Sequence, residues 1–274
     1  MTRLKKQVPS RERVVRKADA RERRYEEDSL MLNKDQEEYQ VSDEVFDRPT
    51  LEAVYRLIHR KVIDRIKGAI KAGKEAHIYW GTDPKGRELA IKIYYTSSAD
   101  FRKGMVKYIE GDPRFGRVRH DIKSIIYIWA QKEFSNLQLA EQAGVNAPRP
   151  IEFYRNILVM TFIGTDGVPA PVLREKRPED PEAFYRLLLD EMRLMYARAG
   201  LVHGDLSEYN VMIWEEKPVI FDISQAMLKA HPMAWELLRR DIENVNAYFG
   251  RIGVRVYEND RVEEWVTGGA EDLR

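Results

Sequence analysis

The sequence contains no cysteine among its 274 residues. That absence excludes disulfide bonds, thiolate metal sites and cysteine nucleophiles from every account of what the chain does. No apolar run approaches the roughly 20 residues that a membrane-spanning helix requires, and the N-terminus has no apolar signal core. Positive and negative charge nearly cancel, with 46 Lys and Arg against 45 Asp and Glu. Bulk charge therefore indicates neither a nucleic-acid nor a membrane partner, and we expect a soluble cytoplasmic protein.

Apolar and charged residues are present in quantity, at 43% and 33% of the chain respectively. They suffice for a large core, either in one domain or in two lobes that share an interface. Residues 1–45 are the exception, because they interleave many charges and hold little to bury. We expect a tail or a solvated helix there, with a basic arm that touches RNA as the alternative.

One stretch of the chain places oxygen-bearing side chains at a fixed spacing. His203-Gly204-Asp205 is followed by Asn210, five residues after the aspartate, and then by Asp222. Carboxylate and amide oxygens in this order can supply the metal ligands and the base that magnesium-dependent phosphoryl transfer needs. The structural alternative is a polar loop with a helix-capping aspartate.

Two apolar runs explain how these distant oxygens would meet. Residues 211–214 and 218–221 are predicted strands, and 215–217 is the predicted turn between them. Folding this hairpin would place Asn210, before the first strand, beside Asp222, after the second.

Upstream, the sequence predicts three antiparallel strands over 65–73, 76–83 and 88–95. A glycine-containing loop joins the first two, and its exposed backbone N–H groups could cover a nucleotide's phosphates, although one glycine usually marks only a turn. The loop consists of Lys71, Ala72, Gly73, Lys74, Glu75 and Ala76. Lys92 lies in the third strand, where a lysine is usually a snorkelling surface residue. The loop before it makes Lys92 a candidate phosphate-binding lysine.

Helical periodicity predicts four helices, over 50–66, 121–143, 181–200 and 232–253. Thr50 is the expected N-cap of the first helix. Residues 96–120 are an expected long polar loop, and the residues after 253 an expected terminal cap. The last helix is expected to bury Trp235, Leu238, Ile242, Val245 and Phe249.

Two further positions bear on a nucleotide site. Glu133 lies beside the apolar stripe of the 121–143 helix and is either an ordinary exposed glutamate or the ion-pair partner that holds Lys92. Residues 160–164 leave the sheet and would connect two lobes, where backbone groups can read an adenine edge.

The order of these elements resembles that of a protein kinase-like fold, and the sequences of four segments point to one family within it. The chain resembles the RIO family of atypical protein kinases, most closely an archaeal-type member of its first subfamily, over residues 45–260. The segments that carry the resemblance are AIKIY (90–94), WAQKEFSNL (129–137), HGDLSEYN (203–210) and IFDISQA (220–226).

The resemblance implies an α+β, protein kinase-like two-lobed fold. Its expected parts are a charged tail at 1–45, an N-lobe at 46–160 and a mainly helical C-lobe at 161–274. The N-lobe would hold a small antiparallel sheet, an extra N-terminal helix, the nucleotide-covering loop and a flexible insertion. The C-lobe would lack an activation segment and peptide-docking helices.

Carried over position by position, the resemblance also implies roles for single residues. Lys92 would bind the α and β phosphates of ATP and pair with Glu133. Asp205 would orient the acceptor and take its proton, while Asn210 and Asp222 would bind Mg²⁺, or Mn²⁺ in its place. The remaining implied nucleotide contacts are the loop residues Lys71, Ala72, Gly73, Lys74, Glu75 and Ala76, the backbone of Thr161 and Ile163, and Ser207 and Tyr209.

The chain departs from ordinary protein kinases at several of these positions. Gly204 stands where an arginine usually pairs with a phosphorylated activation loop, and Ser207 replaces a lysine that often steadies the γ-phosphate. Asp222 is followed by Ile and Ser rather than Phe and Gly. The missing docking platform puts peptide phosphorylation in doubt as the main activity and favours ATP turnover coupled to a conformational change.

The resemblance therefore implies an ATP-dependent Ser/Thr kinase and ATPase that forms an aspartyl-phosphate during maturation of the small ribosomal subunit. The expected partners are ATP, the pre-small ribosomal subunit with its rRNA and proteins, and a protein substrate or the chain itself. One alternative is a small-molecule phosphotransferase of the aminoglycoside or choline kinase type, against which the compact 225–274 segment argues. The other is a non-catalytic assembly factor that only binds ATP.

Overall fold

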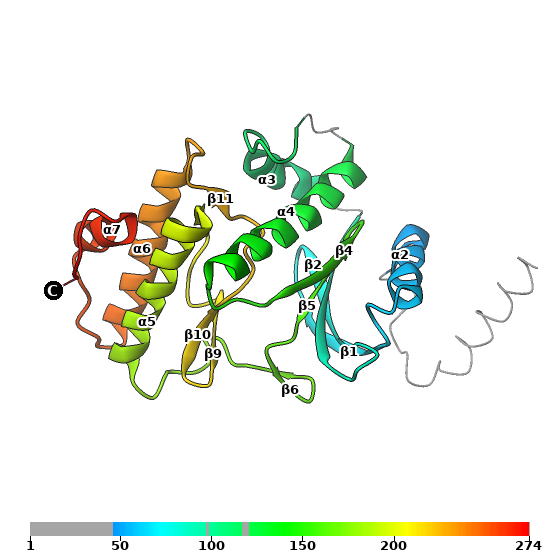
Figure 1. Ribbon diagram of the computed structural model, residues 1–274, viewed down its shortest axis with the longest axis horizontal. Helices are drawn as coiled ribbons and strands as arrows, with labels where there is room; N and C mark the ends of the chain where they lie inside the picture. Colours follow the sequence, from blue (N-terminus) through cyan, green and yellow to red (C-terminus); the bar gives the residue numbers. More distant parts are fainter. Residues whose placement is uncertain (1–45, 97–98, 117–120, 274) are drawn as a thin grey trace, which may run out of the picture. The chain divides into compact units, whose positions relative to one another are not determined.

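A five-stranded sheet with the strand order β1-β2-β3-β5-β4 forms one part of the core. Neighbouring strands pair antiparallel throughout, as predicted for the first three. The computed structural model describes residues 46–96, 99–116 and 121–273, so the predicted tail at 1–45 and its RNA-binding alternative lie outside it. The strands are β1 (Arg65–Ala72), β2 (Ala76–Thr82), β3 (Glu88–Tyr94), β4 (Pro150–Tyr154) and β5 (Ile157–Thr161) (Figure 1).

The central strand β3 is buried on both faces. Its residues from Leu89 to Tyr94 are all buried between β2 and β5. Lys92 is only 5% exposed, so the surface alternative for this lysine is wrong. A buried lysine requires partners for its charge, and these define the site described below.

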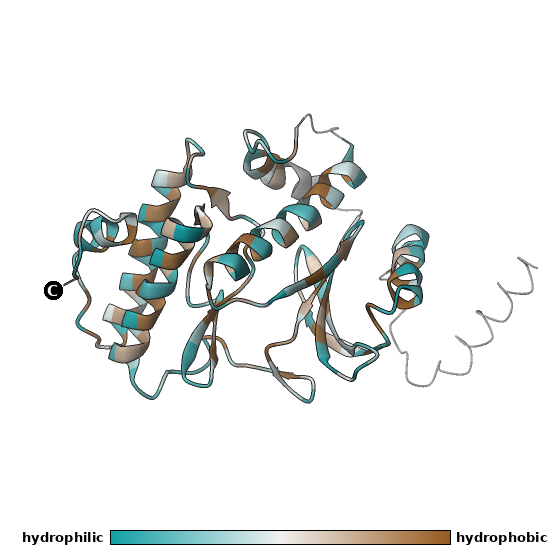
Figure 2. Cartoon of the chain, in the orientation of Figure 1, coloured by the Kyte–Doolittle hydropathy of each residue, from teal (hydrophilic) through white to brown (hydrophobic). Residues whose placement is uncertain are grey.

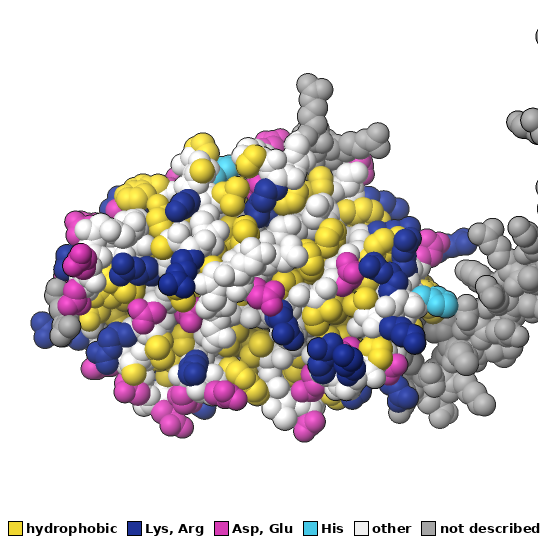
Figure 3. All heavy atoms as spheres, in the orientation of Figure 1, with side chains coloured by type: hydrophobic (Ala, Val, Ile, Leu, Met, Phe, Trp, Pro, Cys, Tyr) yellow, Lys and Arg dark blue, Asp and Glu magenta, His cyan; other side chains and the backbone are white. Residues whose placement is uncertain are grey.

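Strand β1 ends the sheet and has a different character. Two bulges interrupt its pairing with β2, and Arg65, Lys67 and Lys71 are exposed. Figure 3 shows Lys and Arg side chains gathered over the part of the sheet that β1 and β2 occupy. This edge is therefore irregular and positively charged.

The second part of the core is helical. Helix α5 (Pro181–Leu194) continues into the π-helical turn η1 (Met195–Ala199), and α6 (Ala234–Arg251) packs against it. The ring of Tyr185 lies 5.0 Å from that of Phe249, centroid to centroid. Hydrophobic and hydrophilic residues alternate around both helices, as expected where one face is buried (Figure 2). Gly200, at φ 67°, ends η1 where the sequence predicted a helix stop.

Helix α4 (Ile122–Ala143) lies between these two parts (Figure 1). The Asp121 carboxylate caps it by accepting the Ser124 N–H at 2.9 Å, and Gly144, at φ 79°, ends it. The helix packs against β4 and β5 on one side and against η1 on the other. Side chains from a single helix can therefore reach both the sheet and the loops of the helical part.

Three two-stranded sheets, of which the first and third are hairpins, complete the described fold. They pair β6 (Gly164–Thr165) with β7 (Val168–Pro169), β8 (Leu201–Val202) with β11 (Met227–Leu228), and β9 (Val211–Trp214) with β10 (Lys217–Ile220).

The segment predicted as a long polar loop, 96–120, contains a helix, α3 (Ala99–Ile109). Met105, Tyr108 and Ile109 are buried, and the Tyr108 ring lies 6.0 Å from that of Trp129 on α4. Their spacing is helical, but the many polar residues around them hid the pattern.

The first and last helices also differ from expectation. Helix α2 (Arg48–His59) is shorter than predicted and is capped by Asp47, whose carboxylate accepts the Thr50 N–H at 3.0 Å. The residues after 253 contain a helix, α7 (Asn259–Thr267). On α6, Trp235 is 51% exposed, so its predicted burial is wrong, whereas the other four predicted core residues are buried. Trp235 lies beside the buried stripe of α6, to which its neighbours Ala234, Leu237 and Leu238 belong.

Candidate active site

The β9–β10 hairpin closes tightly and brings its two ends together. Its turn is two residues, Glu215 and Glu216, both with positive φ (51° and 55°), a conformation that matches the twist of the flanking strands. The prediction of a three-residue turn is corrected accordingly, because Lys217 already pairs with Trp214. At the open end the Phe221 N–H donates to the Asn210 carbonyl at 3.1 Å. Asn210 is thus a direct neighbour of the segment that carries Asp222.

The Asp222 carboxylate is the meeting point of the site. Its Oδ1 accepts from the Lys92 ammonium at 2.8 Å and from the Ser224 hydroxyl at 3.2 Å. Desolvation by the surrounding protein raises the pKa of Asp222, but the charge and hydrogen bond of Lys92 outweigh it and hold the pKa below its usual value. The side chain is 43% exposed, so an ionised oxygen remains accessible to a ligand.

Lys92 joins this carboxylate to helix α4. Its Nζ lies 2.9 Å from Glu133 Oε1, and the Tyr94 hydroxyl donates to the other Glu133 oxygen. Burial alone would lower the pKa of Lys92, but Asp222 and Glu133 outweigh it and hold the pKa well above its usual value. An ammonium has three N–H donors, and these two ion pairs engage two of them. The predicted Lys92–Glu133 pair is present, with Glu133 only 1% exposed.

The loop of Asp205 is fixed by α6. The Asp241 carboxylate on α6 accepts the N–H groups of Gly204 and Leu206, at 2.7 and 2.9 Å, while the Arg240 guanidinium donates to the Gly204 carbonyl. Burial raises the pKa of Asp241 to about 6 in spite of these bonds. Sequence analysis did not identify Asp241, although an aspartate between buried positions of an amphipathic helix was a usable signal.

Asp205 and Asn210 occupy opposite ends of this loop and contact each other. The Asn210 side-chain N–H donates to the Asp205 carbonyl at 2.8 Å, so the amide oxygen is the end of Asn210 that could bind a cation. Desolvation raises the pKa of Asp205, opposed by the charge of His203. The His203 ring contacts the Phe221 carbonyl at 3.1 Å and thereby connects the loop to the hairpin.

The other predicted residues of this loop lie toward its outer side. Tyr209 is exposed, and its hydroxyl accepts from Arg174 at 3.3 Å. The Ser207 carbonyl accepts the Asn210 N–H at 3.0 Å. These contacts stabilise the loop, and a nucleotide role for Ser207 and Tyr209 stays a prediction.

The predicted phosphate-covering loop is a short connection between β1 and β2. The Gly73 N–H donates to the Ala76 carbonyl at 3.0 Å, and the Glu75 carbonyl accepts the Tyr95 N–H at 3.0 Å. Desolvation, reinforced by the negative charge of Asp222, raises the pKa of Glu75 to about 7. The negative charges of the site therefore act on the pKa of the Glu75 carboxyl. Of the other predicted loop residues, Lys71 and Ala72 are the last residues of β1 and Lys74 lies in the connection, and all three are exposed.

The predicted adenine contacts lie where the chain leaves β5. The Thr161 N–H donates to the Arg149 carbonyl and the Ile163 carbonyl accepts the Ala170 N–H, both at 2.9 Å. These two backbone groups are engaged within the protein. An adenine contact at Thr161 or Ile163 would use their other backbone groups and stays a prediction.

Glu75→Gln is expected to stabilise the protein at alkaline pH but not at acid pH. The folded-state pKa of Glu75 is raised to about 7, so ionisation costs stability progressively as the pH rises from the ordinary glutamate value through 7. The amide removes this cost, which we expect to be about 1–2 kcal/mol at pH 8.5 after solvent screening. Urea unfolding without nucleotide at pH 5 and pH 8.5 measures it. Glu110→Gln, at an exposed position, is the control, and an equal gain at both pH values would contradict the prediction.

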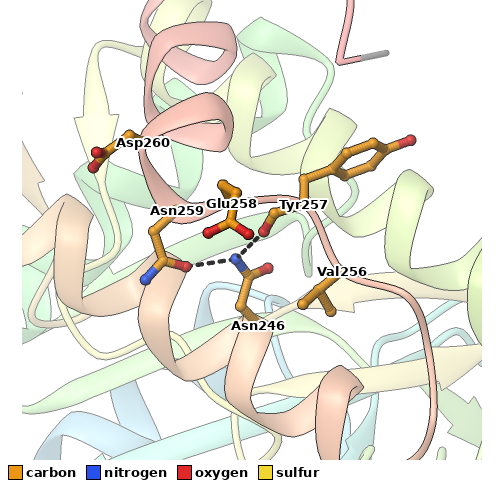
Figure 4. A pocket seen from close by; sticks show the side chains of 6 residues that line it. All are labelled: Asn246, Val256, Tyr257, Glu258, Asn259 and Asp260. Atoms are coloured by element: carbon orange, nitrogen blue, oxygen red, sulfur yellow. Dashed lines mark hydrogen bonds between the residues drawn. The ribbon is translucent and has the colours of Figure 1, made fainter.

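Two small pockets are lined by residues other than those of the site. One, of about 240 Å³, is formed by α6 and the start of α7 and is lined by Asn246, Val256, Tyr257, Glu258, Asn259 and Asp260 (Figure 4). Its buried Asn246 donates to the Tyr257 carbonyl at 2.9 Å and to Asn259 Oδ1 at 2.6 Å. This amide is satisfied within the protein, so the pocket is an element of the α6–α7 packing rather than a competing site.

The part of the chain that the structure describes contains no group of three or more His, Asp or Glu side chains arranged to hold a metal ion. Across 46–96, 99–116 and 121–273, no helix has the length and apolar character to cross a bilayer.

Comparisons with known proteins agree on one family. A family model described as the RIO domain matches residues 77–262. The RIO-type serine/threonine-protein kinase Rio1 of Haloferax volcanii is 41% identical over 94% of this chain and 86% of its own length. Its namesake from Methanocaldococcus jannaschii is 37% identical over 85% of this chain and 79% of its own.

Solved structures confirm the fold. The Rio2 kinase from Chaetomium thermophilum superposes with a TM-score of 0.60 and 26% identity, over 77% of this chain and 66% of that chain. Its complex with ADP, Mg²⁺ and phosphoaspartate gives 0.58 and 25%, over 81% and 67%. The fold is thus α+β and protein kinase-like, and relatives named as protein kinases do not support the small-molecule phosphotransferase alternative. With more than half of its length matched by the family model, the chain belongs to the RIO family of serine/threonine protein kinases.

Proposed function

We propose that the chain is an atypical Ser/Thr protein kinase and ATPase that transfers the γ-phosphoryl group of magnesium-bound ATP by way of a phosphorylated Asp222. The observation that carries this proposal is the Lys92 ammonium, held between Glu133 at 2.9 Å and Asp222 at 2.8 Å. A positive charge fixed beside an accessible carboxylate suits a phosphate group and its metal ion better than any other ligand.

The residues present fit a magnesium ion. Asp222 offers a carboxylate oxygen and Asn210 an amide oxygen, and Mg²⁺ usually takes one or two protein oxygens and completes its shell with phosphate oxygens and water. Mn²⁺ would be accepted by the same oxygens. When bound, the metal supplies charge neutralisation for the phosphates. A Rio2 kinase has been solved with ADP, Mg²⁺ and phosphoaspartate, which supports the same use of Asp222 here.

We assign the other residues to supporting roles. Asp205 would accept the proton of an incoming hydroxyl or water, since its raised pKa makes it a better base than an ordinary aspartate. Lys71 to Ala76 would cover the phosphates, and the connection through Thr161 and Ile163 would lie along the adenine. The N-lobe would comprise 46–160 and the C-lobe 161–274.

The biological setting we propose is maturation of the small ribosomal subunit in the cytoplasm, with rRNA and ribosomal proteins as the surface on which ATP turnover is coupled to release or rearrangement. The first relatives match over most of their length, at 86% and 79%, so the same domain carries the activity. Two observations support the proposed ribosomal role. The sequence of the site resembles that of the family, and the connection between Asp222 and α6 is short and leaves little room for peptide docking.

The test is ATP turnover by the purified chain with and without purified small ribosomal subunits. We expect magnesium-dependent phosphate release and a hydroxylamine-sensitive label on the protein, both at a low rate that subunits increase. Large ribosomal subunits at the same concentration are the control. If neither small nor large subunits change the rate of ATP turnover, the ribosomal role is rejected. If turnover and label are absent under all conditions, the catalytic proposal is rejected.

A further inference from the structure

Helix α4 carries a second lysine that the proposed chemistry does not use. Lys132, next to Glu133, is 0% exposed. Its ammonium donates to the Ser224 carbonyl at 3.0 Å and also to the Ala226 carbonyl. Desolvation lowers the pKa of Lys132 to about 7, which shows how costly its burial is. The hydrogen bonds to these two carbonyls offset part of the desolvation cost, and they attach Lys132 to the backbone of residues 224–226.

One turn along the same helix, Asn136 holds the same piece of backbone. Its side-chain N–H groups donate to the Ile223 carbonyl at 2.8 Å and to the Ala226 carbonyl at 3.1 Å. Asn136 is also fully buried. Two side chains of α4 thus satisfy three carbonyls of the four residues that follow Asp222.

These carbonyls belong to a loop with little regular structure of its own. Residues 223–226 connect Asp222 to β11, and within them the Ala226 N–H donates to the Ile223 carbonyl at 3.2 Å. Asp222 itself has a φ of 57°, in the left-handed region that aspartate adopts more readily than most other residues. The bonds from Lys132 and Asn136 hold the carbonyls of the residues that directly follow it.

We propose that Lys132 and Asn136 are positioning residues that fix the 222–226 loop, so that α4 sets Asp222 from two directions at once. Through Glu133 the helix holds Lys92, which binds the Asp222 carboxylate at 2.8 Å. Through Lys132 and Asn136 it holds the backbone that follows. A shift of α4 therefore moves the lysine and the carboxylate together and preserves their geometry. This inference rests on the proposed role of Asp222 and adds the device that orients it.

The discriminating variant is Lys132→Met, which keeps the length of the side chain and removes its donors and charge. The change removes the cost of burying a charge but leaves the Ser224 carbonyl without its donor, and these two effects oppose each other. We therefore expect an unfolding midpoint close to that of the wild type. Catalysis should nevertheless fall by about 10- to 100-fold, as expected when a reacting group loses its fixed position. ATP affinity measured without magnesium should stay within about twofold, because Lys92 and Glu133 are unchanged.

Hydrogen exchange of the free protein supplies a readout that needs no activity. Peptides covering 222–228 should exchange at least about tenfold faster in Lys132→Met and in Asn136→Leu than in the wild type, because their carbonyls lose the fixed donors of α4. Lys123→Met, at an exposed position near the start of the same helix, is the matched control and should change neither exchange nor turnover.

The outcomes separate this inference from the proposed function. Unchanged exchange and unchanged turnover in both variants would overturn the inference, as would a large loss of stability with turnover intact, since Lys132 would then serve the core alone. If the wild type shows no ATP turnover, the proposed function fails, while faster exchange over 222–228 would still establish the positioning contact.

Discussion

Asp222→Ala is expected to abolish magnesium-dependent ATP hydrolysis, by about 10³-fold or more, and to remove the hydroxylamine-sensitive phosphate label. The change deletes a proposed metal ligand and the proposed phosphoryl acceptor in one step. It also frees the Lys92 ammonium from its 2.8 Å bond to Asp222 Oδ1, while the bond to Glu133 remains. Phosphate release and acid-stable protein label, measured side by side with labelled ATP, check both expectations.

Ser224→Ala is the matched control for this experiment. Its hydroxyl donates to the same oxygen of Asp222 at 3.2 Å, so the variant perturbs the carboxylate without removing it. We expect it to retain turnover within about tenfold. A label that persists in Asp222→Ala would assign the phosphoryl acceptor to another residue, and persistent hydrolysis would remove Asp222 from the metal site as well.

Asp205→Asn is expected to reduce phosphoryl transfer by about 10²- to 10⁴-fold and to leave nucleotide binding intact. The amide has the shape of the carboxylate but cannot accept the proton of the acceptor. The backbone contacts of the loop persist, since Asp241 holds Gly204 and Leu206 through their N–H groups. Single-turnover kinetics with a protein acceptor, together with ATP affinity by calorimetry, separate the two quantities.

Glu208→Gln makes the same chemical change three residues further along the loop. Glu208 pairs with Arg251 at 2.7 Å, and we expect its amide variant to keep both activity and binding. Equal losses of affinity and rate in Asp205→Asn would mean that this residue serves nucleotide binding, and the division of roles between Asp205 and the Lys92 side of the site would fail.

The elements predicted with success are those whose signal is local in the sequence. The apolar runs on either side of Glu215 fix the β9–β10 hairpin, and that hairpin alone places Asn210 beside the segment of Asp222. Likewise α4 has a continuous apolar stripe, a capping aspartate and a terminal glycine. Helix α3 was missed because charged residues and Gly104 interrupt its apolar positions, and its burial depends on Trp129, which the local pattern does not include.

The contacts that sequence analysis missed are those between a side chain and a distant backbone group. Asp241 meets Gly204 and Leu206, and Lys132 meets Ser224, in each case across more than 30 residues. No spacing rule connects such partners, because any residue can supply a backbone N–H or carbonyl. One indirect signal existed. Lys132 and Asn136 both lie on the buried face of α4 that includes Trp129, and a polar residue at a buried position requires a partner.

The edge strand β1 has a consequence for how copies of this protein meet. An unpaired strand offers its free N–H and carbonyl groups to any other chain, and sheets extend across molecules in this way when aggregates form. Here a second copy would bring its own Arg65, Lys67 and Lys71 against the same three cations, and the two bulges would break the register of a continuous ladder. The repulsion between these cations and the broken register together disfavour pairing of two copies of the protein through β1.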